Sequence, residues 1–141
     1  MKRNILTIAV ALIAVVATVF YAHADSKTYK KLDSKEVIMH YTAATLLGNT
    51  THNKHIFADD FEYSNTANNN KVDRKAYIKH LKSIKDLKYN ATQTLEIIDQ
   101  VGKSAVGKVT MDFGSFTRVD HITMIQSNNG WKISKVVTTY P

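Results

Sequence analysis

The amino-acid sequence predicts an α+β domain in which helices come first and antiparallel strands follow. Apolar residues recur at helical spacing in two segments, residues 33–48 and 73–84. From Tyr89 onward they alternate with a period of two, which is typical of strands. Asn129-Gly130 then supplies the strongest short-range signal for a hairpin. Helices gathered ahead of strands that short turns connect are the order of an α+β fold.

The composition suits one globular domain and excludes several classes of protein. The chain has 141 residues, 44% hydrophobic and 22% charged, which excludes wholesale disorder. It has no cysteine, so a disulfide scaffold, a thiolate metal site and a cysteine nucleophile are excluded. The glycine motifs of dinucleotide-binding, phosphate-loop and α/β-hydrolase proteins do not occur either.

Residues 1–24 have the three parts of a secretory signal peptide. A positively charged start precedes an apolar stretch, and the small-x-small sequence Ala22-His23-Ala24 follows. We predict cleavage after Ala24 and a secreted or periplasmic protein. The alternative is that residues 5–22 are retained as a membrane anchor, since their length approaches the roughly 17–20 residues that a spanning helix needs.

Cleavage would leave a polar tail at residues 25–32 and a domain at residues 33–141. It removes Lys2 and Arg3 and no acidic residue, so the net charge falls from +7 to +5. No basic patch is interleaved with aromatic residues. We therefore predict neither a nucleic-acid partner nor, after cleavage, a membrane partner.

The first helix has clear start and stop signals. Asp33 and Glu36 form a capping box, and Gly48 follows the helical pattern as a natural C-terminal stop. Apolar residues between them recur at helical spacing: Val37, Ile38, Tyr41, Ala44, Thr45 and Leu47.

A mixed segment separates the two helices. A short helical turn at residues 55–58 leads into a strand-like stretch at residues 60–64, and the asparagine-rich residues 66–71 form a turn. Asp73 then caps the second helix. Its predicted apolar face contains Ala76, Tyr77, Leu81 and Ile84.

The remainder of the chain predicts four strands. They cover residues 89–100, 104–113, 117–126 and 131–139. Short turns separate them, so we expect an antiparallel meander.

Four segments, in this order, carry a resemblance to a known superfamily. They are residues 57–63 (FADDFEY), 102–109 (GKSAVGKV), 116–125 (FTRVDHITMI) and 129–136 (NGWKISKV). The set resembles the nuclear transport factor 2-like superfamily, and more closely its small bacterial branch labelled putative lumazine-binding or polyketide-cyclase-like. The resemblance spans about residues 34–138.

This resemblance implies a cone-shaped fold, in which a strongly curved antiparallel sheet wraps around N-terminal helices. It also implies a pocket between the concave face and the first helix, and a homodimer through the outer face of the sheet. The superfamily includes isomerases, dehydratases, epoxide hydrolases and cyclases, but also many members without demonstrated activity. Fold analogy therefore does not settle the function, and we expect no cofactor.

The strand at residues 117–126 supplies the catalytic candidate, His121. Side chains alternate between the two faces of a strand, so one face holds Val119, His121, Thr123 and Ile125. We expect this face to be the inner one. A neutral imidazole there is suited to general-base work. We expect His121 and Thr123 to line the pocket together with Tyr41 and Tyr63, whose hydroxyls can polarise a ligand carbonyl.

Each of these candidates has a structural alternative. His121 can lie on the dimer-facing surface, and Tyr41 can be a core residue. Asp120 is expected to make a cross-strand charge pair with Lys132 or Lys135. Trp131 is expected in the core or at the dimer contact.

A metal site is the weaker interpretation of the sequence His52-x-x-His55. Two histidines three residues apart can share a helical face, and Asp59 and Asp60 follow closely. The segment is a polar loop, so we predict no metal.

Three functional hypotheses follow. The first is an exported, homodimeric module that binds a small, largely apolar molecule. The second is an isomerase-, dehydratase- or cyclase-type enzyme that uses His121 with Tyr41 or Tyr63. The third is a protein-interaction domain whose own side chains fill the pocket. Binding leads, because the sequence shows no convincing acid–base pair.

Overall fold

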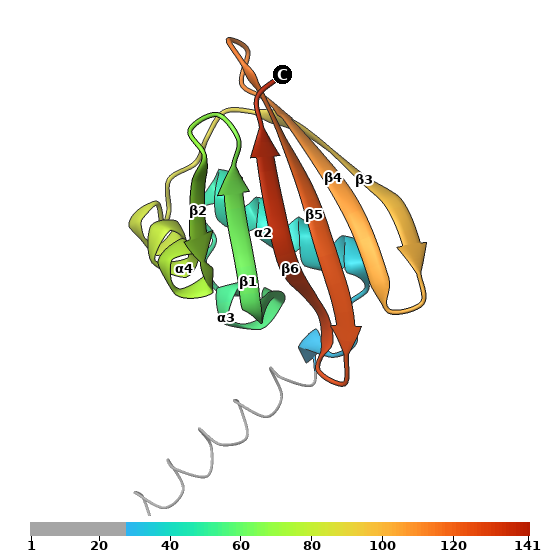
Figure 1. Cartoon of the computed structure of the whole chain (residues 1–141). Helices are drawn as coiled ribbons and strands as arrows, with labels where there is room; N and C mark the ends of the chain where they lie inside the picture. The colour runs from blue at the N-terminus through green and yellow to red at the C-terminus, as the bar shows by residue number, and fades with distance from the viewer. Residues whose placement is uncertain (1–27) are drawn as a thin grey trace, which may run out of the picture.

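The computed structural model describes residues 28–141, in which a curved six-stranded sheet has helix α2 lying across one face (Figure 1). The predicted signal peptide, residues 1–24, lies outside the described residues. None of the helices within residues 28–141 is long and apolar enough to cross a membrane.

The elements follow the predicted order, with one strand added. The helices are α2 (Ser34–Leu47), α3 (Asn53–Ile56) and α4 (Arg74–Ser83). The strands are β1 (Phe57–Asn65), β2 (Asn70–Asp73), β3 (Thr92–Val101), β4 (Ser104–Asp112), β5 (Thr117–Ser127) and β6 (Gly130–Thr139). The short strand β2 has almost entirely exposed side chains, which is why no alternation in its sequence predicted it.

The sheet is mixed rather than wholly antiparallel. Its strand order is β2-β1-β6-β5-β4-β3, and β3 to β6 form the predicted meander. β1, however, pairs with β6 in parallel. All the other pairings are antiparallel, so this is the one junction that departs from the predicted antiparallel sheet. Parallel neighbours need a long crossover, and here α4 and β3 to β5 all lie between the two partners in the chain.

Helix α2 begins and ends as its sequence predicts. The Glu36 amide donates to Asp33 Oδ1 at 2.8 Å, and the Asp33 amide donates to Glu36 Oε2 at 2.8 Å. Gly48 ends the helix with φ of 65°. The predicted apolar face is buried except at its last position, where Leu46 packs inward and Leu47 is exposed.

The end of α2 is joined to the loop that follows α4. The Asp86 amide donates to Gly48 O at 3.0 Å, and the Tyr89 amide donates to Leu46 O at 2.8 Å. These bonds hold residues 84–89 against the C-terminal end of α2. They therefore fix the direction in which the chain leaves α4 for β3.

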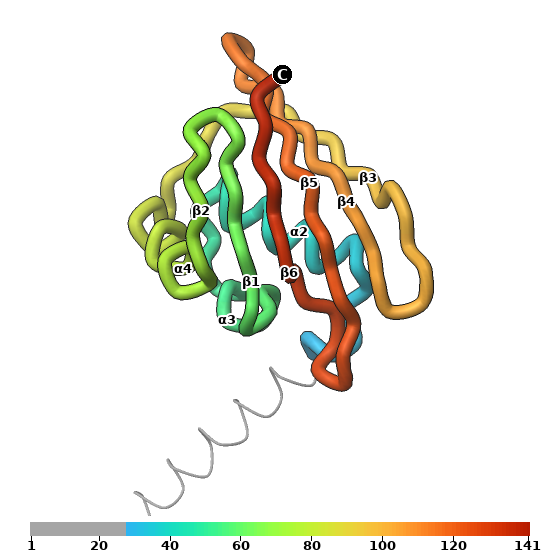
Figure 2. The backbone as a smooth tube through the Cα atoms, viewed as in Figure 1, coloured from blue at the N-terminus to red at the C-terminus, as the bar shows by residue number. Residues whose placement is uncertain are grey.

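Aromatic side chains meet at one end of the sheet. The backbone trace shows the C terminus at the same end as the turn between β4 and β5 (Figure 2). Phe113 and Phe116 in that turn stack with centroids 4.7 Å apart, and Phe116 lies 6.1 Å from Tyr140. Tyr89 approaches the same group, 6.4 Å from Phe113. This group forms one rim of the pocket described below.

Candidate functional site

A buried carboxylate lies at the centre of the domain. Asp120 of β5 is 0% exposed, and four protein hydrogen bonds reach its two oxygens. Oδ1 accepts from Arg118 Nε at 2.9 Å and from Thr138 Oγ1 at 2.6 Å. Oδ2 accepts from Arg118 Nη2 at 2.9 Å and from Tyr41 Oη at 2.6 Å. α2, β5 and β6 thus each contribute to one cluster.

Arg118 is the charge partner of this carboxylate. The two residues are separated by one position on β5, so their side chains share a face of the strand. The bidentate geometry is the strong form of an arginine–carboxylate pair. Burial alone would lower the pKa of Arg118, but its interactions with Tyr41 and Asp120 outweigh burial and raise it. The guanidinium therefore stays charged.

Two more tyrosines extend the cluster away from Asp120. Tyr77 Oη of α4 donates to Tyr41 Oη at 3.3 Å, and the ring of Tyr63 stacks on that of Tyr77 with centroids 4.7 Å apart. Burial is the largest cause that raises the pKa of all three hydroxyls, and the charge of Asp120 adds to it. They remain protonated donors throughout the physiological range.

The raised pKa values predict a loss of stability in alkali. The unfolded tyrosines release their protons near pH 10, whereas the folded ones keep theirs. Between those pKa values the native state binds more protons, so the free energy of unfolding falls with pH, by at most about 1.4 kcal/mol per pH unit for each tyrosine. Urea unfolding from pH 8 to 11 should show a midpoint that declines above about pH 10. A midpoint that tyrosine-to-phenylalanine replacement leaves equally pH-sensitive would contradict this assignment.

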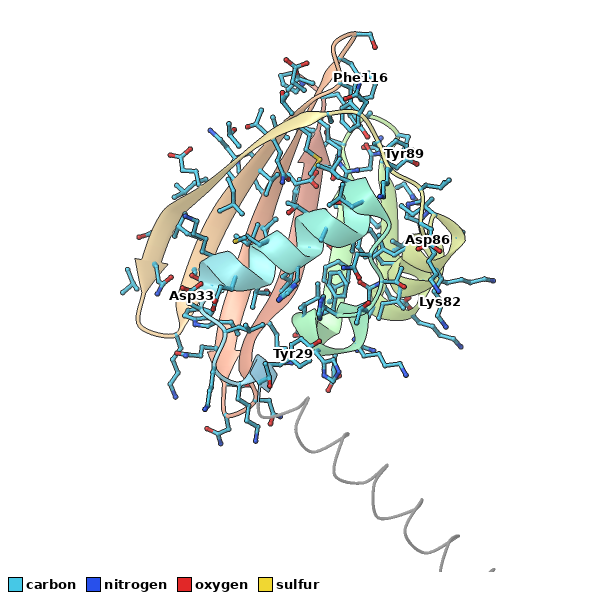
Figure 3. All side chains as sticks on the ribbon, turned by 180° about the vertical axis from the view of Figure 1, so that it is seen from behind. Tyr29, Asp33, Lys82, Asp86, Tyr89 and Phe116 are labelled. Carbon is cyan, nitrogen blue, oxygen red and sulfur yellow. The ribbon has the colours of Figure 1, made fainter. Side chains whose placement is uncertain are left out.

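A pocket of about 620 Å³ lies against the cluster. Arg118, Tyr63 and Tyr77 form the wall that it shares with the cluster. The other lining residues come from the end of α2, from β1 and β2, from α4 and from the aromatic rim: Thr45, Leu46, Asn65, Asn70, Val72, Ala76, His80, Leu81, Ile84, Tyr89, Phe113, Phe116 and Tyr140. Figure 3 shows two of the rim residues, Tyr89 and Phe116, beyond the C-terminal end of α2. The pocket walls are therefore mostly aromatic and aliphatic, and their polar groups are those of Arg118, His80, Thr45, two asparagines and the tyrosine hydroxyls.

The polar cluster is built to hold a geometry rather than to exchange protons. A carboxylate has about four acceptor positions, and all four at Asp120 are used by protein donors. No lone pair is left for a substrate proton. Asp120 is thus a structural anchor for Arg118 and Tyr41.

The structure separates the four predicted pocket residues. Tyr63 lines the pocket, and Tyr41 lies behind its wall with its hydroxyl on Asp120. His121 and Thr123 lie on the other face of β5, where His121 is exposed. The expectation that their face is the inner one is wrong. The buried face holds Asp120, Ile122 and Met124.

The reason for this reversal is the ion pair itself. Arg118 and Asp120 made their face look polar, yet the two charges compensate each other and Thr138 and Tyr41 complete the hydrogen bonds. A compensated pair can be buried where a single charge cannot. The signal that the sequence offered was an arginine and an aspartate two residues apart, Arg118 and Asp120, on the same face of the strand as Ile122.

Two other sequence expectations are resolved here. Asp120 does not pair with Lys132 or Lys135: Lys135 Nζ lies 3.6 Å from Glu62 Oε1, and Lys132 Nζ donates to His55 O. Trp131 is 5% exposed and belongs to the core, one of its two predicted positions.

The histidines of His52-x-x-His55 pack against other rings. The ring centroids of His52 and His40 are 4.0 Å apart, and His55 stacks on Tyr29 with ring centroids also 4.0 Å apart. Within residues 28–141 no three histidine or carboxylate side chains gather as metal ligands would. The metal interpretation gains no support.

A curved sheet with a helix across one face is the fold that solved nuclear transport factor 2-like proteins share. The chain itself belongs to the family described as "Putative lumazine-binding", which matches residues 30–140. A comparison with curated proteins finds no match.

Solved structures share the fold at low sequence identity. A nuclear transport factor 2-like protein of unknown function from Silicibacter pomeroyi is 16% identical, with a TM-score of 0.63 over 86% of this chain and 98% of that one. One from Methylobacillus flagellatus is 19% identical, with a TM-score of 0.62 over 79% and 97%. A "putative ketosteroid isomerase" from Parabacteroides distasonis is 14% identical, with a TM-score of 0.58 over 79% and 91%. At these identities the likeness shows the fold alone.

Proposed function

We propose that this protein is an exported module that binds a small, largely apolar molecule in the pocket beside Arg118. The observation that carries the proposal is the pocket itself, about 620 Å³ with mostly aromatic and aliphatic walls. Binding sites for small molecules have this character: apolar walls and a few placed polar groups. Export rests on the signal-peptide pattern of residues 1–24.

Exposed aromatic residues at the rim support binding over a filled core. Tyr89, Phe116 and Tyr140 are 45%, 49% and 43% exposed although they line one continuous hollow. When a ligand covers aromatic surface that was in contact with water, the free energy of the system falls by about 25 cal/mol for each Å² removed from water. A protein whose own side chains filled the pocket would bury these rings instead.

The geometry favours binding over catalysis. An acid–base enzyme needs two titratable groups whose environments separate their roles. Asp120 is fully hydrogen-bonded, and His121 lies on the opposite face of β5. His80 lines the pocket, but no carboxylate among the described lining residues accompanies it. The isomerase-like alternative thus loses His121, the base on which it depended.

A bulky side chain at Ala76 tests the proposal. Ala76 is an exposed residue of α4 that lines the pocket, so Ala76→Trp should fill the hollow without entering the core. We expect the affinity for the neutral fluorescent probe N-phenyl-1-naphthylamine to fall at least about tenfold, which corresponds to about 1.4 kcal/mol of lost binding. Probe titration by fluorescence measures this.

The matched control is Lys75→Trp. Lys75 is the preceding residue, exposed and outside the pocket, so this variant adds the same ring elsewhere on α4. Its affinity should stay within about twofold of wild type. The proposal fails if wild-type protein does not bind the probe, or if the two tryptophan variants bind it equally.

A further inference from the structure

We infer that the natural ligand carries a carboxylate at one end of an apolar body, and that Arg118 is the residue that recognises it. This inference rests on the proposed function, because it names the chemistry of the molecule that the same pocket takes.

The first support is the set of donors that Arg118 leaves unused. Its hydrogen bonds to the protein all come from Nε and Nη2: two to Asp120, one to Tyr41 Oη and one to Thr138 Oγ1, the last two at 3.4 Å. A guanidinium has five N–H donors. Nη1 makes no hydrogen bond to any residue of the described chain, and Arg118 lines the pocket. Its two N–H groups are therefore available to a ligand.

The second support is the direction of the ion pair. The Asp120 side chain is 0% exposed, whereas 19% of the Arg118 side chain is exposed. The negative end of the pair is sealed in the core and the positive end faces the pocket. No aspartate or glutamate is among the described residues that line it, and His80 is there with Arg118. A cationic ligand would face the guanidinium with no carboxylate among the described lining residues to pair with.

The third support is a second donor on the same wall. Tyr63 lines the pocket beside Arg118, and burial, which raises the pKa of its hydroxyl, keeps that hydroxyl protonated. A carboxylate can accept from a guanidinium and a phenol at once. Such charge-assisted bonds are roughly twice as strong as neutral ones. The aromatic rim then covers the apolar remainder of the ligand.

The experiment compares two competitors that differ only in this end group. 2-Naphthoate and 2-naphthamide have the same ring, and each is used to displace N-phenyl-1-naphthylamine from protein expressed from the full chain. We expect 2-naphthoate to compete at least about tenfold more strongly than the amide. Equal competition, or a preference for the amide, would overturn the inference while probe binding leaves the proposed function standing. Absence of probe binding would remove both.

Variants then assign the preference to Arg118. Arg118→Lys keeps the charge but loses the fork geometry, and Arg118→Met combined with Asp120→Leu removes the ion pair without leaving a buried charge. The carboxylate preference should shrink in the first and fall to within about twofold in the second. Lys79→Met, an exposed change on α4 outside the pocket, should keep the wild-type ratio.

The ratio of the affinities for the two competitors does not depend on how tightly a variant binds the probe. An altered probe affinity therefore does not obscure the result. A full carboxylate preference in the double variant would show that another group recognises the ligand and would overturn the assignment. If neither Arg118 variant folds, the inference is tested by the wild-type ratio of affinities and by Tyr63→Phe. We expect Tyr63→Phe to reduce the preference for 2-naphthoate.

Discussion

Replacing Asp120 with alanine is expected to lower the free energy of unfolding by about 3–5 kcal/mol. The carboxylate accepts four hydrogen bonds and is the ion-pair partner of Arg118. Its removal leaves a guanidinium largely buried without a counterion, and it frees the hydroxyls of Tyr41 and Thr138. Because the free energy of unfolding of a domain is only about 5–15 kcal/mol, this loss would leave the variant with little stability.

Urea unfolding followed by fluorescence measures the loss. Trp131 is the only tryptophan of the chain and is buried, so its emission reports the core. Asp99→Ala is the matched control, since Asp99 lies on β3 and is exposed, and it should change stability by no more than about 0.5 kcal/mol. Adding Arg118→Met to Asp120→Ala should restore part of the loss, because the uncompensated charge disappears. A loss below about 1 kcal/mol for Asp120→Ala would contradict the burial of a charged pair.

Replacing Gly48 with alanine is expected to cost about 2–5 kcal/mol, the sum of two effects. The first is backbone strain, because φ at Gly48 is +65° and side-chain-bearing residues rarely adopt that conformation. The second is crowding: a Cβ there would lie 2.4 Å from the amide nitrogen of Asp86 and 2.7 Å from that of Leu87. Both are backbone atoms engaged in hydrogen bonds, the Asp86 amide to Gly48 O and the Leu87 amide to Ile84 O, so they cannot move aside cheaply.

Gly102→Ala separates these two effects. Gly102 has a similar φ of +55°, but nothing lies within 4 Å of the position its Cβ would take. Only the conformational strain remains, and we expect a loss of about 1–2 kcal/mol. The difference between the two variants, measured by urea unfolding, gives the cost of the close approach. Equal losses would mean that the loop at residues 84–89 yields freely.

Local signals in the sequence were sufficient for most of the fold. The capping box of Asp33 and Glu36, the stop at Gly48 and the cap at Asp73 each depend on residues within a few positions of each other. The hairpin at Asn129-Gly130 is equally local. Such interactions involve only residues that are close together in the chain, so they can be recognised without knowing the rest of the molecule. Tyr63, one of the predicted pocket residues, lies on the pocket wall.

The candidate site could be predicted only in part. Tyr41 and Tyr63 were identified as residues near the pocket, whereas His121 and Thr123 were placed on the wrong side of β5. Neither face of this strand is wholly apolar, so its period of two left both orientations possible.

The sequence by itself determined the α+β class, the ends of α2 and α4 and the meander of β3 to β6, whereas the helical turn expected at residues 55–58 is α3 at Asn53–Ile56. Only the tertiary structure decided the parallel pairing of β1 with β6 and the inward face of β5. For the face of β5, the physical reason is that a charged residue can be buried only where partners compensate it, and two of the partners of Asp120 come from distant parts of the chain. Tyr41 and Thr138 lie 79 and 18 positions from Asp120 in the chain, and folding alone brings them to its oxygens.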